Sequence, residues 1–413
     1  MPTQTEHIAH QVAGSARPAG CPIALLTGGV DRQYAYGLAM ALVSSGIRVE
    51  VVGGDSIDSP EMHTTSDLEF VNLWPSRENK ATLMSKIWRT ARDYASLVRY
   101  AAVAKPRVFH ILWNRKIEFV DRVLLMLYYK LLGKKIVLTV HNVNQARRDG
   151  RDSWVNRLTL GIQYRYSDHL FVHTNKMKEE LIEDFGADER RITVIRYPLN
   201  NALPDTDLTP AEAKLGLGFK EHEKVILFLG KIKPYKGIEH LLTAFHKLVS
   251  GDDSYRLVVA GEVQKGNESY MKSLEEKICG QDRNKILLRK EYIPDEEMEI
   301  YLKAGDVLVL PYNEIFQSGV LFLSYSFGLP VIVTDVGSFR EEIVEGKTGY
   351  LCPPGDPVAM ARTIEYYFES DLYRNLGTRR QEIKEYAEMN HSWGAVADQT
   401  RSAYAALLVS LPS

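Results

Sequence analysis

The stretch Leu227-Phe228-Leu229-Gly230-Lys231-Ile232-Lys233-Pro234-Tyr235-Lys236-Gly237, near the middle of the 413-residue chain, decides the interpretation of the whole sequence. An apolar run ends at Gly230, and a helical pattern of apolar residues starts at Ile238. This order predicts a buried strand, a tight turn and a helix. The turn places Lys231 and Lys236 at the carboxyl edge of a sheet, where their ammonium groups suit a diphosphate leaving group. Solvated loop lysines are the alternative.

Strands and helices alternate on both sides of this stretch. Before it, β-rich runs lie at 23–26, 48–52, 108–112, 136–140, 169–173 and 192–195, with helical patterns such as 120–132 and 175–185 between them. From it onward, the expected strands are 225–229, 257–260, 286–288, 307–310, 331–334 and 350–351, and the helices about 238–249, 269–279, 295–304, 318–327 and 357–369. The alternation predicts an α/β protein with two tandem Rossmann-like, doubly wound domains that face each other across a cleft.

Length and composition limit the class of protein. A chain of 413 residues exceeds what one hydrophobic core usually serves, and the polar stretch 200–210 reads as a linker. We therefore expect a flexible N-terminus (1–20) and domains at 21–200 and 201–388. Apolar residues make up 45% and charged residues 25%, which is typical of a soluble globular protein.

Targeting and cysteine signals favour a cytoplasmic protein. Residues 1–20 contain no apolar run of the signal-peptide type, and the densest apolar segment, 123–129, is far shorter than the ~20 residues of a membrane span. The three cysteines are widely separated, which argues against a disulfide scaffold or a cysteine zinc site.

Positive charge is concentrated in one segment. Residues 77–135 hold 14 basic and 4 acidic side chains. Four of the basic residues alternate with apolar residues near helical spacing: Lys86, Arg89, Arg92 and Arg99, among Ile87, Trp88, Tyr94, Leu97, Val98 and Tyr100. A basic amphipathic helix can lie on an anionic membrane or attract a phosphorylated acceptor. A solvated helix face is the alternative, and no motif accompanies the charge that would favour nucleic acid.

Two glycine-containing turns differ in what they predict. Thr27-Gly28-Gly29 lacks the Gly-x-Gly-x-x-Gly spacing, which argues against NAD; the turn leaves room for a ligand or serves the chain reversal alone. Ser318-Gly319-Val320 starts a predicted helix directly after a loop, and its unpaired N–H groups would form an anion site. Two anion-binding devices in one domain strengthen the diphosphate hypothesis.

From about Ile23 to Leu408, the chain resembles the GT-B glycosyltransferases, in particular the large family four of retaining sugar-nucleotide transferases. Three blocks carry this resemblance: Gly230-Lys231 with Lys236-Gly237, then Asp306 to Tyr312 with Gly328-Leu329-Pro330-Val331, and Thr139-Val140-His141-Asn142. The resemblance implies that the C-terminal domain holds a nucleotide diphosphate sugar and the N-terminal domain selects the acceptor. It also implies that residues 389–413 form a helix crossing back to the N-terminal domain.

The local patterns described above and the resemblance together assign roles to individual residues. The diphosphate is assigned Lys231, Lys236, Ser318, Gly319 and Val320, the donor and nucleotide pocket Gly230, Tyr292, Pro311 and Gln317, and the acceptor loop Gly28 and Gly29. His141, the first polar residue after an apolar strand, is expected to face the donor sugar. Asp31 is the expected base for an acceptor hydroxyl if the enzyme inverts, with a helix cap as the alternative.

One departure from the family pattern bears on the mechanism. The family's two glutamates, eight positions apart, fall at Ile315 and Leu323, and a leucine cannot hold the nucleotide ribose. Glu314, one position away, is the expected catalytic carboxylate. The phosphate-binding backbone is therefore retained while the carboxylate pair is not.

We expect no required metal and no cofactor, because lysines and helix N-termini neutralise the diphosphate; Asp205-Thr206-Asp207 lies in the expected linker. The expected reaction moves a sugar from a UDP- or GDP-linked donor to a glycan or lipid-linked acceptor, with retention, at the inner face of the cell membrane. This reaction would serve polysaccharide or glycolipid synthesis. An inverting transferase, an epimerase or phosphorylase, and a non-catalytic sugar-nucleotide-binding subunit are the alternatives.

Overall fold

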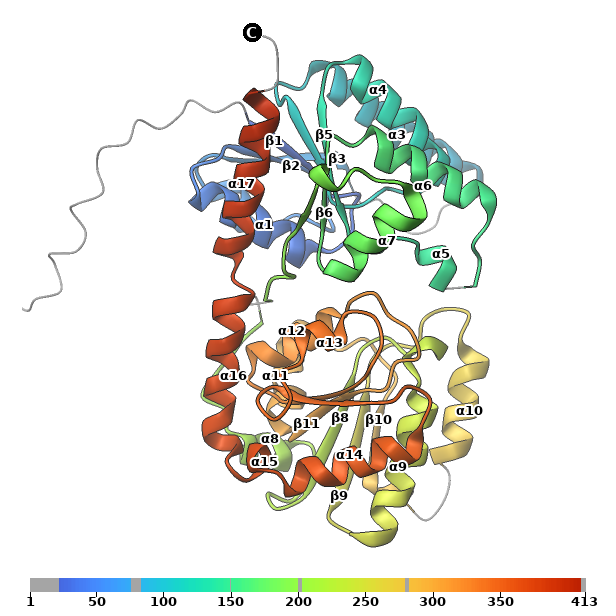
Figure 1. Ribbon diagram of the computed structural model, residues 1–413, viewed down its shortest axis with the longest axis vertical. Coiled ribbons are helices and arrows are strands. Elements are labelled where there is room, and N and C mark those ends of the chain that lie inside the picture. Colours follow the sequence, from blue (N-terminus) through green and yellow to red (C-terminus); the bar gives the residue numbers. More distant parts are fainter. Residues whose placement is uncertain (1–21, 76–82, 149, 200–202, 279–281, 410–413) are drawn as a thin grey trace, which may run out of the picture. The chain divides into compact units, whose positions relative to one another are not determined.

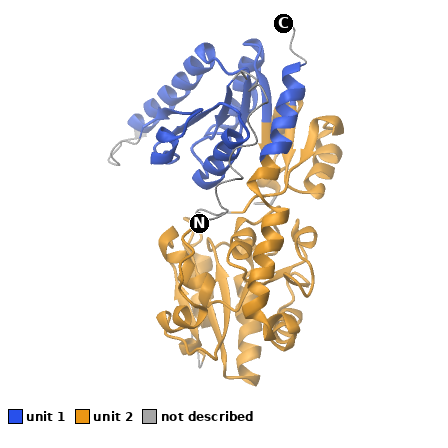
Figure 2. Ribbon diagram, turned by 90° about the vertical axis from the view of Figure 1, so that its left-hand side faces the viewer, with its two compact units in different colours: residues 1–137, 166–168, 397–413 blue, residues 138–165, 169–396 orange. Residues whose placement is uncertain are grey.

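The computed structural model describes residues 22–75, 83–148, 150–199, 203–278 and 282–409 (Figure 1). The chain forms two compact units, shown in separate colours in Figure 2. Unit 1 comprises residues 1–137, 166–168 and 397–413, and unit 2 comprises residues 138–165 and 169–396.

The first half of the chain builds a seven-stranded sheet in the order β3-β2-β1-β4-β5-β6-β7. Its strands are β1 (Ile23–Leu26), β2 (Val49–Gly54), β3 (Leu68–Trp74), β4 (Val108–Ile111), β5 (Lys135–Val140), β6 (His169–Val172) and β7 (Ile192–Val194). The interior strand β1 pairs in parallel with β2 and β4, and all four of its residues are buried. Burial on both faces explains why the interior strands β1, β4, β5 and β6 are apolar runs without alternation.

Helices connect these strands. They are α1 (Arg32–Ser44), α2 (Pro60–Thr64), α3 (Leu83–Val103), the π-helix η1 (Val120–Leu124), α4 (Leu125–Leu131), α5 (Gln145–Arg148), α6 (Trp154–Tyr166), α7 (Asn175–Phe185) and the 3₁₀ turn η2 (Glu189–Arg191). Thr174 caps α7 by accepting from the Met177 N–H at 3.1 Å, and Gly186 ends that helix in the left-handed region.

The second half builds a six-stranded sheet in the order β10-β9-β8-β11-β12-β13, whose strand pairs are parallel. Its strands are β8 (Lys224–Leu229), β9 (Tyr255–Ala260), β10 (Ile286–Arg289), β11 (Val307–Leu310), β12 (Val331–Thr334) and β13 (Gly349–Cys352). One continuous hydrophobic cluster fills the space between this sheet and its helices, with Phe228, Phe245 and Tyr312 among its fully buried members.

The helices of this half are α8 (Pro210–Gly216), η3 (Pro234–Lys236), α9 (Ile238–Gly251), α10 (Glu268–Ile278), η4 (Arg283–Lys285), α11 (Asp295–Ala304), α12 (Gly319–Ser326), α13 (Phe339–Glu342), α14 (Pro357–Glu369), α15 (Asp371–Arg374) and α16 (Leu376–Asn390). The last helix, α17 (Trp393–Val409), ends in unit 1, where the Tyr404 hydroxyl contacts His110 Nδ1 of β4 at 2.6 Å.

The expected doubly wound sheets are confirmed, and their expected strands and the helices between them are present with boundaries within two residues. The helix expected over 389–413 differs: in the described residues α17 runs from Trp393 to Val409, because α16 extends to Asn390. Strand β3 was not predicted. Most of its residues are half-buried or exposed because the strand lies at the edge of its sheet, so it lacks the continuous apolar run of its neighbours. The domain boundaries and the cleft stay predictions.

Candidate functional site

The turn after β8 is held tightly against the end of β11. Gly237 has φ 62°, and a Cβ at this position would lie 2.1 Å from the Pro311 carbonyl oxygen. Only glycine fits both the conformation and the approach. The preceding residue, Lys236, is therefore fixed beside the end of β11.

The Lys236 side chain is buried beside the rings of Tyr235 and Tyr312. Its exposed fraction is only 7%, and its Nζ donates to the Tyr312 hydroxyl at 2.5 Å and lies 4.2 Å from the centre of that ring. Burial raises the pKa of Tyr312, so this phenol stays neutral and does not cancel the ammonium charge. An ammonium has three N–H donors and can bond several acceptors at once. The arrangement suits an anion as a further acceptor.

The start of α12 joins the same cluster. The Ser318 hydroxyl lies 3.4 Å from the Tyr312 hydroxyl and does not cap the helix. A Cβ on Gly230 would lie 3.4 Å from Lys236 Nζ and 3.5 Å from Val320 Cγ2. The structure thus brings Gly230, Lys236, Ser318 and Val320 together beside a helix N-terminus, where N–H groups favour an anion.

Gln317, directly before this helix, has a buried side-chain amide. Neither its Oε1 nor its Nε2 has a hydrogen-bond partner among the described residues. Leaving a buried polar group unsatisfied costs about 1–3 kcal/mol, which a polar ligand would relieve. Lys231, in contrast, has an exposed side chain, and Tyr292, between β10 and α11, is 63% exposed.

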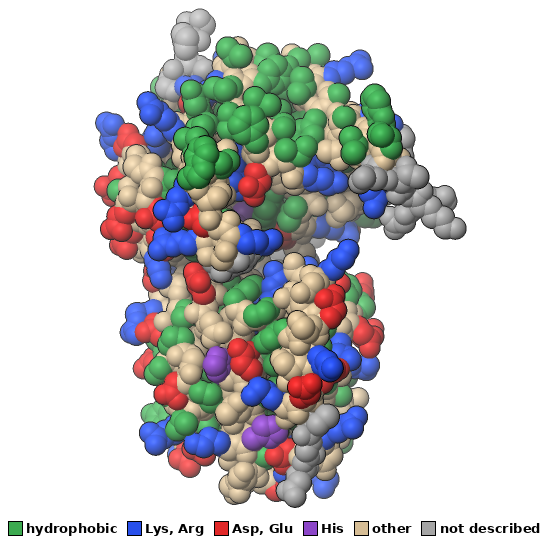
Figure 3. Space-filling model, turned by 90° about the vertical axis from the view of Figure 1, so that its right-hand side faces the viewer, with side chains coloured by type: hydrophobic (Ala, Val, Ile, Leu, Met, Phe, Trp, Pro, Cys, Tyr) green, Lys and Arg blue, Asp and Glu red, His purple; other side chains and the backbone are tan. Residues whose placement is uncertain are grey.

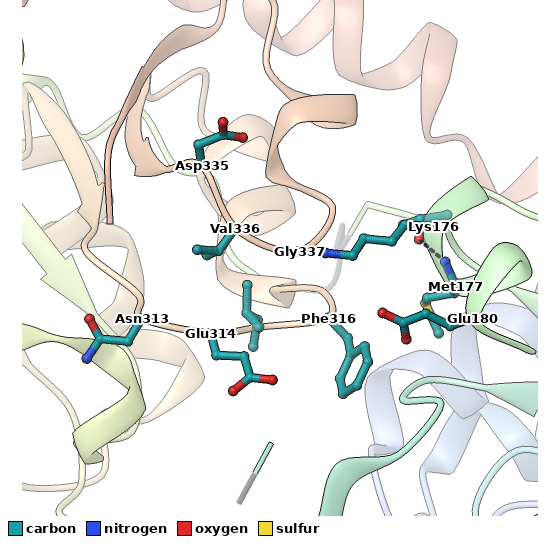
Figure 4. Close-up of a pocket in the computed structure, with 11 residues that line it drawn as sticks. Lys176, Met177, Glu180, Asn313, Glu314, Phe316, Asp335, Val336 and Gly337 are labelled. Carbon is teal, nitrogen blue, oxygen red and sulfur yellow. Dashed lines mark hydrogen bonds between the residues drawn. The ribbon is translucent and has the colours of Figure 1, made fainter. Parts of the chain in front are cut away.

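A pocket of about 240 Å³ lies within unit 2 next to the loop that follows β11 (Figure 4). Its lining comprises Thr174, Lys176, Met177, Glu180, Asn313, Glu314, Ile315, Phe316, Asp335, Val336 and Gly337. The carboxylates of Glu180 and Glu314 enter it from α7 and from the loop (Figure 4). Burial raises the pKa of Glu180, and the charge of Glu314 raises it further. Such a lining suits hydroxyl groups of a neutral sugar better than a diphosphate.

His141 follows β5 and is oriented by a second histidine. His173, directly after β6, is fully buried, and burial lowers its pKa to about 4. Its Nδ1 lies 3.1 Å from the Ile195 carbonyl oxygen, which can only accept, so Nδ1 holds the proton. Its Nε2 therefore accepts from His141 Nδ1, at 3.0 Å. His141 thus has its proton on Nδ1 and presents Nε2 as an acceptor.

Sequence reasoning missed His173 and Glu180. The signal for His173 was the one used for His141, a polar residue immediately after an apolar strand. Carboxyl ends of neighbouring parallel strands meet at one edge, so two such histidines lie close together. No comparable signal marks Glu180, because its place in the pocket depends on how α7 packs.

Asp31 and the glycines before it belong to unit 1. Asp31 has φ 51° and caps α1 by accepting from the Tyr34 N–H at 3.0 Å, which is the alternative role considered for it. A Cβ on Gly28 would lie 2.7 Å from the carbonyl oxygens of Trp113 and Asn114, so this glycine admits neighbouring backbone; Gly29 has φ 82°.

The remaining candidates fall into three groups. Ile315 and Leu323 lie in the hydrophobic cluster, as expected of residues that cannot replace carboxylates. The Asp205 carboxylate pairs with Lys303 at 2.9 Å and Lys384 at 2.7 Å. The four basic residues Lys86, Arg89, Arg92 and Arg99 lie on α3.

Two features are absent from the described part of the chain. No group of three or more His, Cys, Asp or Glu residues there could hold a metal ion. No helix there combines the length and apolar character required to cross a bilayer.

Two family models match the chain. Residues 27–200 match the model described as Glycosyltransferase Family 4, and residues 211–389 match the model described as Glycosyl transferases group 1. The D-inositol 3-phosphate glycosyltransferase of Corynebacterium efficiens is 30% identical over 274 residues, which cover 64% of this chain and 62% of that protein. The N-acetyl-alpha-D-glucosaminyl L-malate synthase of Bacillus anthracis is 28% identical over 60% of this chain and 62% of its own length.

Solved structures share the fold over nearly the whole chain. The sucrose-phosphate synthase of Thermosynechococcus elongatus has a TM-score of 0.73 and 18% identity, covering 95% of this chain and all of its own. HepE of Anabaena, solved with UDP-glucose, has a TM-score of 0.71 and 15% identity, covering 94% of this chain and 100% of the HepE chain. At these identities the likeness establishes the architecture alone, and that architecture is the GT-B type expected from the sequence.

Proposed function

Because the chain belongs to glycosyltransferase family four, we propose that it transfers a sugar from a nucleoside diphosphate sugar, linked to UDP or GDP, to a glycan or lipid-linked acceptor. In this reaction the bond between the anomeric carbon and the β-phosphate oxygen breaks. The acceptor oxygen bonds to the anomeric carbon and loses its proton, and the nucleoside diphosphate leaves with the bonding electrons.

The observation that carries the proposal is the cluster of Lys236, Tyr312 and Ser318 at the start of α12. In our proposal the Lys236 ammonium and the first N–H groups of α12 hold the diphosphate. Charge develops on this group as the bond breaks, and fixed donors in a dry site stabilise it without reorganising. The Gln317 amide is a further partner for the donor, and no divalent ion is required.

The proposal assigns the sugar to the region of Glu314 and His141. His141 Nε2 accepts a hydrogen bond from a sugar hydroxyl, and His173 fixes the ring in the tautomer that allows this contact. The family's first glutamate position is occupied by Ile315 in this chain, and Glu314, which lines the pocket, is directly next to it. We expect retention at the anomeric carbon.

The relatives support the reaction class and leave the acceptor open. HepE was solved with UDP-glucose, and the two sequence relatives are named a D-inositol 3-phosphate glycosyltransferase and an N-acetyl-alpha-D-glucosaminyl L-malate synthase. The alignments with the first curated relatives span about 57–66% of those proteins, so their acceptors are not transferred to this chain. Work in polysaccharide or glycolipid synthesis, at the cytoplasmic face of the membrane, is part of the proposal.

The test is a thermal-shift screen against UDP- and GDP-linked sugars, followed by NMR of the product anomer. A ligand that binds only the native state raises the midpoint temperature of unfolding. At a concentration of a hundred times its Kd it adds about 2.7 kcal/mol to the free energy of unfolding. Binding with hydrolysis or transfer supports the proposal, and the anomer separates retention from inversion. Binding without turnover in the presence of a lipid extract favours the non-catalytic subunit, and release of an epimer or sugar phosphate favours an epimerase or phosphorylase.

A further inference from the structure

Helix α3 has an apolar stripe that faces solvent. Exposed apolar residues recur along it every three or four positions: Met84, Ile87, Trp88, Ala91, Ala95, Val98 and Ala102. Trp88 is 71% exposed and Met84 64%. The core-facing side of the helix is a different one, formed by Asp93, Tyr94, Leu97 and Ala101. The stripe is therefore not part of the fold's own core.

The neighbouring helix has a second stripe of this kind. Leu124, Leu127 and Leu131 are 50%, 37% and 85% exposed, and Phe119, just before η1, is 54% exposed. The Tyr128 hydroxyl donates to the Val98 carbonyl at 3.1 Å, so α4 packs along α3. A second contact joins the Tyr94 hydroxyl to the Asp121 carboxylate at 3.1 Å. Residue numbers rise together in both contacts, which means that the helices run parallel.

Together the two stripes form one surface on unit 1, which we call the α3–α4 surface. It comprises Met84, Ile87, Trp88, Val98, Phe119, Leu124, Leu127 and Leu131. Figure 3 views the molecule from the side on which α3 and α4 lie in Figure 1, and hydrophobic side chains gather there. Monomeric proteins rarely expose large contiguous apolar patches, so a surface made of eight exposed apolar side chains calls for an occupant.

The charges beside the stripe identify that occupant. At ~100° per residue, Arg92 and Arg99 lie on α3 directly beside the apolar stripe, and Arg89 follows one step further round the helix. No ion pair among the described residues involves these three side chains. A two-fold interface between copies of the chain would bring these cations together, which is unfavourable. An anionic bilayer satisfies both features, because its headgroups attract the cations while its acyl region accepts the apolar side chains.

We propose that the α3–α4 surface is a docking site for an anionic lipid bilayer. The apolar side chains of both helices enter the interface, and Arg89, Arg92 and Arg99 contact the headgroups. This arrangement narrows the basic patch expected from the sequence. Lys86 falls on the side of Leu97, away from the stripe, and Tyr94 and Leu97, counted there as part of the amphipathic pattern, face the core. Membrane docking is independent of transferase activity, so each can fail without the other.

The test measures co-sedimentation of the full chain, without nucleotide sugar, with phosphatidylcholine vesicles that contain or lack phosphatidylglycerol. The wild type binds only the anionic vesicles, and more weakly at high salt. The variant Arg89→Gln/Arg92→Gln/Arg99→Gln should bind about a hundredfold more weakly, since each lost charge weakens binding by roughly tenfold or less. Its matched control neutralises three exposed lysines of unit 2, Lys247→Gln/Lys265→Gln/Lys272→Gln, and keeps wild-type binding.

The apolar part is tested by Trp88→Ser/Leu127→Ser, with Leu215→Ser/Met389→Ser as the control, since those two side chains are 63% and 74% exposed in unit 2. The first variant should lose binding at low and high salt, and the control should not. Unchanged binding of the Trp88/Leu127 variant overturns the proposal. So does a wild-type dimer that binds no vesicles and becomes monomeric in this variant, because the surface would then join two copies.

Discussion

Replacement of Lys236 by Gln tests the diphosphate assignment most directly. The ammonium is buried, 7% exposed, so its contact with a phosphate oxygen is a desolvated, charge-assisted hydrogen bond. Such bonds contribute about 1.5–3 kcal/mol, which at 1.4 kcal/mol per factor of ten corresponds to roughly 10- to 140-fold in Kd. We expect Lys236→Gln to weaken the binding of UDP or GDP by this factor, measured by isothermal titration calorimetry.

The control is a second buried lysine in the same unit. Lys214 Nζ pairs with the Asp306 carboxylate at 2.9 Å, and both side chains are buried. Lys214→Gln leaves a buried charge without its partner, at a cost of about 3–5 kcal/mol of stability. The hydrogen bond of Lys236 to the neutral Tyr312 phenol contributes less, about 1 kcal/mol, and its loss leaves no charge without a partner. Lys214→Gln should therefore be the less stable variant, and Lys236→Gln should be the one that binds the nucleotide more weakly.

The result that refutes the reasoning is a folded Lys236→Gln protein with wild-type affinity for the nucleoside diphosphate. Tyr312→Phe adds a further check, since it removes the phenol but keeps the ammonium. It should retain most of the affinity. If it loses as much as Lys236→Gln, the contact between the two residues, rather than the charge, determines binding.

Three further predictions concern backbone packing, pH and metal. Gly237→Ala places a Cβ 2.1 Å from the Pro311 carbonyl and should destabilise the fold well beyond the ~1–2 kcal/mol of a left-handed non-glycine residue. Gly218→Ala, also at positive φ but with open space, is the control, and equal midpoints in urea would contradict the steric argument. Burial lowers the pKa of His173 to about 4, so its contribution to stability is complete above about pH 6.5 and is lost as the pH falls towards 4. In urea unfolding, the free energy of unfolding of His173→Gln should fall less steeply with decreasing pH than that of the wild type, by about 1.4 kcal/mol per pH unit between these pKa values. An equal slope for the two proteins would disprove this role of His173. EDTA should leave transferase activity unaltered; a loss that Mg²⁺ or Mn²⁺ restores would show that the lysines alone do not neutralise the diphosphate.

Much of the fold follows from local pattern. A strand buried on both faces needs a continuous apolar run, and a covering helix needs apolar residues every three or four positions. Both signals are present for β11 and α11, whose predicted limits coincide with the observed ones. The edge strand β3 depends on pairing with β2 and has no such run, so it became visible only in the sheet.

For the candidate site, the sequence by itself determined which residues follow the strands, including His141 and Lys236, because chain order and the geometry of parallel sheets place strand ends at one edge. The tertiary structure decided their partners: the Tyr312 phenol for Lys236 and His173 for His141. It also decided which side of α3 is covered. Periodicity reveals that a helix has an apolar side, but burial depends on neighbours distant in the chain, and only packing determines which residues remain exposed to another surface.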